Sequence, residues 1–343
     1  MAAQGSTTAR RLAAAAAVLV LLAGAFLVGR TTRHRAEDQK LGKFPEELVY
    51  VRTDDDVVDA GALFAAPRQV AKPIAVVWIH GWGVNFYSPT YVGIGRALAN
   101  RGYSTITGNT RMHDIGNVEK YSFGGKRVRG GGYWGIASEE VRDLAAWIAL
   151  AEQLGFKQVV LAGHSAGWAA VRRYASQSQD PRVVGLVFAS GEVRAEAGPP
   201  DPDQLAQATK MIAEGNPDDL VRIRGRSFPS FVSAGTFMDN VNTPSELGDF
   251  FGISTPNAGV TRVRGPLLAF FGSSGDVGAE RDLELLKSSV ERQSGGPKRV
   301  RIAMIRGGDH MYTGQEEQVA ETIACWAVSL TAGGARKDGV PRH

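Results

Sequence analysis

The sequence predicts an α/β fold with a mostly parallel central sheet and helices on both faces. Short, continuously apolar runs such as 74–79 and 183–189 alternate with stretches of helical spacing. A strand that is apolar on both faces belongs inside a parallel sheet, because both of its faces must be covered. The stretch 159–178 joins one such run to a helix through a tight, glycine-bounded turn. With 343 residues and 43% hydrophobic content, the chain is large enough for a sizeable core.

The first part of the chain predicts a targeting segment rather than part of the fold. Residues 12–29 are uncharged and mostly apolar, and arginines flank them on both sides. A small-x-small pattern at 23–25 favours a cleaved signal peptide, whereas apolar residues up to Val28 favour an uncleaved anchor. We therefore expect residues 1–30 to be a signal peptide or a membrane anchor, and the protein to be membrane-anchored or secreted.

Composition shifts give the remaining boundaries: a polar tether at 31–45, one domain at 46–332 and a disordered tail at 333–343. The first 40 residues hold six of the 39 Lys and Arg and two of the 35 acidic residues, so the rest of the chain carries 33 of each. The net charge of +4 thus lies in the leader, and we expect no nucleic-acid partner.

Two strands are expected at the start of the domain, at 48–53 and 57–64, as an antiparallel pair. The turn between them holds three aspartates, 54–56. A calcium loop needs oxygen ligands at alternating positions and a closing Glu, and both are missing here. We therefore expect a solvated turn and no metal site.

The apolar run 74–79 is followed by His80-Gly81-Trp82-Gly83, whose glycines let backbone N–H groups approach a ligand. A helix at 92–101 and a strand at 103–108 come next, and then a long glycine-rich loop. Its end, 130–135, spells G-x-G-x-x-G before a helix that begins at Ser138. A dinucleotide site needs a strand directly before the glycines and an acid closing the next strand. Neither is present, so we expect no cofactor.

The sharpest motif is Gly163-His164-Ser165-Ala166-Gly167, a G-x-S-x-G between a strand and a helix. So tight a turn strains the central residue and requires small residues two before and two after it. The strain lifts the Ser165 hydroxyl out of the sheet edge. It also aims the N–H of Ala166 at an oxyanion that develops nearby.

After the strand 183–189, the segment 194–264 interrupts the alternation of strands and helices, which predicts a cap inserted over the site. Its phenylalanines are expected either to line an apolar substrate pocket or to form the core of the cap itself. They are Phe228, Phe231, Phe237, Phe250 and Phe251.

The alternation resumes with a strand at 267–271 that leads to Asp276, and then a helix at 280–292. The last strand, 301–305, leads to His310. A final helix at 316–330 contains the only cysteine, Cys325, which we expect to be a small core residue.

These groups are expected at one edge of the sheet, because parallel strands place their sites at their carboxyl ends. A serine hydroxyl needs a base, and the imidazole needs a carboxylate to orient it. Of six histidines only His310 is suitably placed, since the others lie in the tether, the tail, tight loops or ahead of the serine. Asp276 is the favoured acid, and Glu192, at the end of the preceding strand, is its rival.

With these motifs the chain resembles the α/β-hydrolase fold superfamily over about residues 45–330, and the order Ser, Asp, His is that of the superfamily. The resemblance implies a nucleophile at Ser165, an acid at Asp276, a base at His310 and an oxyanion hole from Trp82 and Ala166. It implies a serine hydrolase that cleaves a carboxylic ester, or a related acyl bond, of a small-molecule substrate through an acyl-enzyme. The alternative is a non-catalytic, membrane-tethered protein that binds a small ligand on the same scaffold.

Overall fold

The computed structural model describes residues 46–116, 127–193, 199–224 and 229–332. The expected targeting segment, tether and C-terminal tail lie outside these residues. Contacts divide the chain into two units, Met1–Pro45 and Glu46–His343, and the second unit contains all of the described residues. Within the described residues, no helix is both long enough and apolar enough to span a bilayer.

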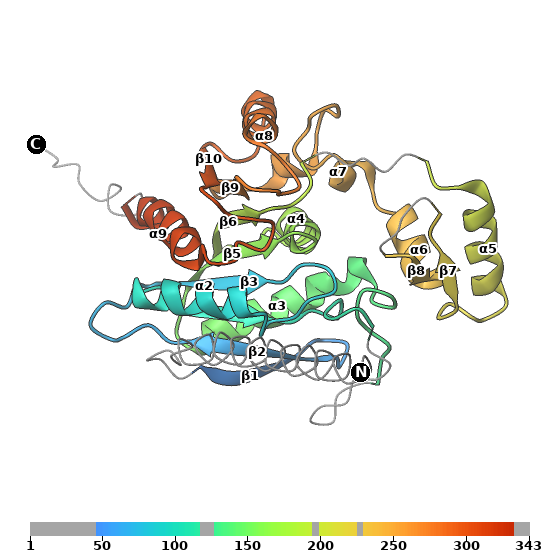
Figure 1. Cartoon of the computed structure of the whole chain (residues 1–343), viewed down its shortest axis with the longest axis horizontal. Coiled ribbons are helices and arrows are strands. Elements are labelled where there is room, and N and C mark those ends of the chain that lie inside the picture. The colour runs from blue at the N-terminus through green and yellow to red at the C-terminus, as the bar shows by residue number, and fades with distance from the viewer. Residues whose placement is uncertain (1–45, 117–126, 194–198, 225–228, 333–343) are drawn as a thin grey trace, which may run out of the picture. The chain divides into compact units, whose positions relative to one another are not determined.

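An eight-stranded sheet forms the centre of this unit, with the order β1-β2-β4-β3-β5-β6-β9-β10 (Figure 1). Its strands are β1 (Glu47–Arg52), β2 (Val58–Phe64), β3 (Ile74–Ile79), β4 (Thr105–Gly108), β5 (Gln158–His164), β6 (Val183–Ala189), β9 (Leu267–Gly272) and β10 (Val300–Ile305). The pairs β1–β2 and β2–β4 are antiparallel, and all the others are parallel. The predicted mostly parallel sheet is confirmed.

Helices cover both faces of the sheet. On one face lie α2 (Pro89–Asn100) and α9 (Glu316–Ala332); on the other lie α3 (Glu140–Gln153), α4 (Gly167–Gln177) and α8 (Glu280–Arg292). The odd-numbered residues of β3 pack into the core with α3, α4 and α8, and the even-numbered ones into the core with α2 and α9. Every residue of this strand is therefore buried, which is why its sequence is continuously apolar.

The segment predicted as a cap packs in two different ways. Helices α5 (Pro202–Ala213) and α6 (Ala234–Val241), with the short strands β7 (Leu220–Arg222) and β8 (Phe231–Ser233), enclose a small core of their own that includes Phe237. Beyond α7 (Ser245–Gly248), Phe250 and Phe251 are instead fully buried in the main core against Trp168 and Phe188.

The expectation for the phenylalanines was therefore wrong for Phe250 and Phe251, which belong neither to a substrate pocket nor to the core of a cap. Phe231 is 38% exposed, and Phe228 lies outside the described residues. An apolar side chain predicts burial, but its sequence position does not say which of two neighbouring cores receives it.

Two other local predictions are wrong. Cys325 is exposed on α9, where its thiol donates a hydrogen bond to Glu321 Oε1 at 3.0 Å, one turn away. The helix expected to begin at Ser138 begins as α3 at Glu140; Ser138 lies in the short 3-10 helix before it, Ala137–Glu139, and its N–H and hydroxyl both bond to the carboxylate of Asp239 on α6. The sequence around each residue did not determine its surroundings. Cys325 lies on the exposed face of its helix, and Ser138 bonds to a residue from a distant segment, Asp239.

Candidate active site

Ser165 sits on a strained turn between β5 and α4. Its backbone is left-handed, with φ of +52°, which is uncommon for a residue with a side chain. A Cβ on Gly163 would overlap the carbonyl oxygen of Gly167, and a Cβ on Gly167 would lie 2.7 Å from that of His80. Only glycine fits at these two positions, and the turn therefore needs both.

The three residues singled out as nucleophile, base and acid lie in one line. Ser165 Oγ is 3.1 Å from His310 Nε2, and His310 Nδ1 is 2.9 Å from Asp276 Oδ1. They follow β5, β10 and β9, so they gather at the carboxyl edge of the parallel strands. The carboxylate only accepts, so Nδ1 carries the ring proton and Nε2 can accept from the serine hydroxyl.

Asp276 is held as an ionised acceptor. Its side chain has no exposed surface, and its oxygens accept hydrogen bonds from the N–H groups of Gly272 (2.5 Å) and Val277 (2.7 Å) and from the hydroxyl of Ser190. Burial acts to raise the pKa of Asp276, but the hydrogen bonds from His310, Ser190 and the two N–H groups outweigh it. The pKa therefore lies below its usual range.

The rival acid, Glu192, is exposed at the end of β6. Nδ1 of the imidazole is already paired with Asp276, at 2.9 Å. Of the two carboxylates, the fold thus brings Asp276 to the ring.

The two residues singled out as oxyanion donors, Trp82 and Ala166, both belong to segments next to Ser165. A Cβ on Gly81 would lie only 3.0 Å from Cβ of Ser165, so the loop after β3 packs closely against Ser165. Ala166 follows Ser165 directly, in a helical conformation at the start of α4. The indole N–H of Trp82 donates to the carbonyl of Gly132 at 3.3 Å, so the G-x-G-x-x-G loop packs against this tryptophan.

A sequence profile of the alpha/beta hydrolase fold matches residues 74–250, just over half of the chain. The chain belongs to this family. Among solved structures, it is similar to Est1E from Butyrivibrio proteoclasticus with ferulic acid bound, at 18% identity and a TM-score of 0.57, covering 83% of this chain and 99% of that one. It is also similar to DcsB in complex with a substrate analogue, at 12% identity and a TM-score of 0.58, covering 84% and 99%.

A third similar structure is the alpha/beta hydrolase GrgF from Penicillium sp. sh18, at 11% identity and a TM-score of 0.57, covering 83% of this chain and 97% of that one. No curated protein matches the sequence. At these identities the structural similarity establishes the fold.

Sequence reasoning missed two residues beside Asp276 of this alpha/beta hydrolase, Ser190 and Tyr312. Both are completely buried, and both have left-handed backbones, with φ of +51° and +60°. The Ser190 hydroxyl bonds to Asp276 and to the Tyr312 hydroxyl, which lies 3.3 Å from the carbonyl of Phe270. Ser190 directly follows a buried strand, and this was the only sign in the sequence that it belongs to the site. Many other residues also follow buried strands.

The other described histidines have structural partners. His80 Nδ1 donates to the carbonyl of Gly81 at 2.7 Å, and its Nε2 accepts from the N–H of Thr110 at 3.0 Å. His113 Nδ1 is 2.7 Å from the carboxylate of Asp114. His164 is fully buried beside the site, and burial, reinforced by neighbouring His310, lowers its pKa to about 4.

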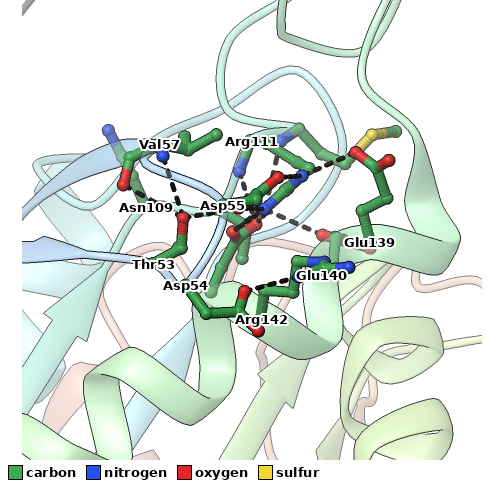
Figure 2. Close-up of polar contacts among 12 residues, drawn as sticks. Thr53, Asp54, Asp55, Val57, Asn109, Arg111, Glu139, Glu140 and Arg142 are labelled. Carbon is green, nitrogen blue, oxygen red and sulfur yellow. Dashed lines mark hydrogen bonds and ion pairs between the residues drawn. The ribbon is translucent and has the colours of Figure 1, made fainter. Parts of the chain in front are cut away.

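An ion-pair cluster around the buried guanidinium of Arg111 supports the loop after β4 (Figure 2). The guanidinium of Arg111 bonds to Asp143 at 2.8 Å, to Glu139 at 2.6 Å and to Asp55 at 3.1 Å. Burial acts to lower the pKa of Arg111, but the carboxylates outweigh it and raise the pKa. Asp55 was expected in a solvated turn; it is instead one of the anchors of Arg111. The cluster holds the backbone next to Thr110, and the N–H of Thr110 in turn donates to His80 Nε2.

Glu140 lies in the same cluster and is also buried (Figure 2). Its Oε1 accepts a hydrogen bond from the Thr110 hydroxyl at 2.8 Å. Burial raises the pKa of Glu140 to about 8; the hydrogen bond from Thr110 opposes the shift, and the charge of Asp143 adds to it. Glu140 is therefore mostly protonated at neutral pH.

Within the residues that the structure describes, no group of three or more His, Cys, Asp or Glu side chains has the arrangement of a metal site. The acidic turn 54–56 uses its carboxylates in ion pairs. Asp54 pairs with Arg142 at 2.6 Å, Asp55 pairs with Arg111, and Asp56 lies 3.5 Å from Arg52.

Proposed function

We propose that this alpha/beta hydrolase is a serine hydrolase that cleaves a carboxylic ester, or a related acyl bond, through an acyl-enzyme. The observation that carries the proposal is the continuous hydrogen-bonded line from Ser165 Oγ through His310 to Asp276, with separations of 3.1 and 2.9 Å. A serine hydroxyl becomes a nucleophile when a base accepts its proton, and this line provides the base and its orienting acid.

In the acylation step, Ser165 Oγ attacks the carbonyl carbon of the ester while His310 Nε2 takes its proton. The carbonyl oxygen becomes an oxyanion, which accepts hydrogen bonds from the N–H groups of Trp82 and Ala166. His310 then gives the proton to the departing alkoxide, and the acyl group stays on Ser165. In deacylation, His310 takes a proton from water as the water oxygen attacks the acyl carbonyl carbon, and it then gives that proton to Ser165 Oγ as the acid is released.

Asp276 remains ionised throughout the cycle. Burial opposes its charge, but its four hydrogen bonds keep the pKa of Asp276 below the usual range. It keeps the proton of neutral His310 on Nδ1 and stabilises the imidazolium that forms in each step.

A small-molecule acyl substrate is supported by the similar structures, since Est1E was solved with ferulic acid and DcsB with a substrate analogue. The alternative of a non-catalytic binding protein gains no support, because holding a ligand does not require a proton path from Ser165 to Asp276. We also propose, from the apolar stretch 12–29 alone, that the domain works outside the cytoplasm, at a membrane or secreted.

The test is hydrolysis of p-nitrophenyl esters of increasing acyl length by the purified full-length chain. Ser165→Ala and His310→Ala should each lower kcat by roughly 10⁴-fold or more, and Asp276→Asn by about 10⁴-fold. Glu192→Gln is the matched control and should keep wild-type kcat. Circular dichroism checks that each variant is folded.

Wild-type turnover in Ser165→Ala would contradict the proposal. A greater loss in Glu192→Gln than in Asp276→Asn would show that the acid is wrongly assigned, while the serine mechanism would stand.

A further inference from the structure

A buried chain of hydrogen bonds joins the loop after β3 to the loop of the base. The N–H of Gly81 is 3.1 Å from the hydroxyl oxygen of Tyr91 on α2. That hydroxyl is 2.7 Å from His164 Nδ1, and His164 Nε2 is 2.7 Å from the carbonyl oxygen of His310. Tyr91 and His164 are both completely buried.

The chemistry of the two ends fixes every proton in this chain. The Gly81 N–H can only donate, and the His310 carbonyl can only accept. His164 therefore carries its proton on Nε2, and its Nδ1 accepts. The Tyr91 hydroxyl accepts from Gly81 and donates to His164, so each group in the chain is satisfied with one arrangement of protons. The low pKa of His164, about 4 because of burial and the neighbouring His310, is consistent with a neutral ring.

Aromatic rings enclose the imidazole of His164. Its ring centroid is 6.5 Å from that of Trp78, 5.7 Å from Tyr312 and 5.0 Å from the imidazole of His310. Water has no access to this fully buried side chain, so a lost hydrogen bond here is not replaced by solvent.

We propose that Tyr91 and His164 are positioning residues for the reaction, holding the backbone of Gly81 and that of His310 in a fixed mutual geometry. Gly81 precedes the oxyanion donor Trp82 and packs against Ser165, with 3.0 Å between a Cβ on Gly81 and Cβ of Ser165. The inference rests on the proposed serine mechanism. In this inference, one buried chain of hydrogen bonds aligns the loop that carries the oxyanion donor with the base, His310.

Misalignment of these groups affects the transition state more than the bound ester, because the oxyanion forms only as the bond is made. Breaking this chain of hydrogen bonds should therefore lower kcat and leave KM nearly unchanged. Binding of a boronic acid, which forms a tetrahedral adduct on the serine, should weaken in parallel with kcat/KM.

The test is Tyr91→Phe in the full-length chain, assayed with p-nitrophenyl esters and phenylboronic acid. The variant keeps the ring and removes the hydroxyl, leaving the Gly81 N–H and His164 Nδ1 unpaired. We expect kcat to fall by roughly 10- to 100-fold, with KM within about twofold of wild type. The matched control is Tyr103→Phe. Tyr103 is buried in the same apolar cluster, but its hydroxyl reaches the carbonyl of Ala324, away from the site.

A second pair of variants tests the other end of the chain. His164→Gln offers one amide oxygen to Tyr91 and one amide N–H to the His310 carbonyl, so it should keep kcat within about tenfold of wild type. His164→Leu offers neither and should lose roughly 100-fold or more. A residue that only fills space would not distinguish glutamine from leucine in this way.

Equal kcat in Tyr91→Phe and Tyr103→Phe would overturn the inference and leave the proposed function intact, since the wild-type chain would still turn over. If Tyr91→Phe does not fold, the His164 pair decides, and equal kcat in glutamine and leucine variants overturns the inference. A folded wild-type chain without any ester turnover would refute the proposed function, and the inference with it.

Discussion

The buried carboxyl group of Glu140 makes a quantitative prediction about stability. In the folded chain burial raises its pKa to about 8, against 4.5 for the free side chain. Between these two pH values the folded state binds one more proton than the unfolded state. The stability that this proton contributes is fully present below about pH 4.5 and is lost as the pH rises toward 8.

A difference of one bound proton changes the free energy of unfolding by about 1.4 kcal/mol per pH unit. Between the unfolded pKa of 4.5 and the folded pKa of about 8, this amounts to about 5 kcal/mol. Glu140→Gln cannot ionise, and its amide oxygen still accepts from the Thr110 hydroxyl. Relative to wild type, the variant should therefore gain about 4 kcal/mol of stability between pH 5 and pH 8.

Urea unfolding of the two proteins at pH 5, 6, 7 and 8 measures this difference. The prediction concerns how the difference in unfolding free energy between the two proteins changes with pH. A constant free-energy cost of burying the new amide N–H does not affect that change. Glu284→Gln is the control for the loss of one surface carboxylate, since Glu284 is exposed on α8. The pH-dependent gain expected for Glu140→Gln should be absent from this control. A difference between Glu140→Gln and wild type that stays constant from pH 5 to pH 8 would refute the reasoning.

Three further predictions concern the residues around Ser165, Asp276 and His310. Ser190→Ala removes the hydroxyl that donates to Asp276 but leaves two backbone donors, so ester kinetics should show roughly a 10-fold lower kcat at unchanged KM. Gly81→Ala places a methyl group 3.0 Å from Cβ of Ser165, and kcat should fall by about 100-fold with little change in melting temperature. The neutral, buried His164 has a pKa of about 4 against 6.5 when free, so the stability that this residue contributes should decline by about 3 kcal/mol as the pH falls through this window, opposite in sign to the contribution of Glu140. Urea unfolding of wild type and His164→Gln between pH 4 and pH 7 checks the last prediction: the variant should gain about 3 kcal/mol of stability relative to wild type as the pH falls, because the contribution of Glu140 is common to both proteins.

The parts of the fold that the sequence predicts well are those with a local cause. The run 74–79 is apolar at every position because both of its faces are covered, and β3 has these bounds in the structure. Ser165, Asp276 and His310 could be singled out because each follows an apolar strand, and parallel strands bring their carboxyl ends to one edge.

The residues that could not be predicted depend on contacts between distant segments. Ser190 and Tyr312 meet across 122 positions of sequence, and Tyr91 and His164 meet across 73. Nothing near these residues in the chain indicates the partner. Cys325 illustrates a smaller ambiguity: its helix has an exposed face as well as a buried one, and a small side chain is compatible with either.

The most direct test of the central claim is covalent labelling of the full-length chain with a fluorophosphonate, followed by peptide mass mapping. If His310 activates Ser165, the adduct forms on Ser165, is absent in Ser165→Ala, and forms at least about 10³-fold more slowly in His310→Ala. An adduct on another serine, or no adduct on the folded wild-type chain, would contradict the account.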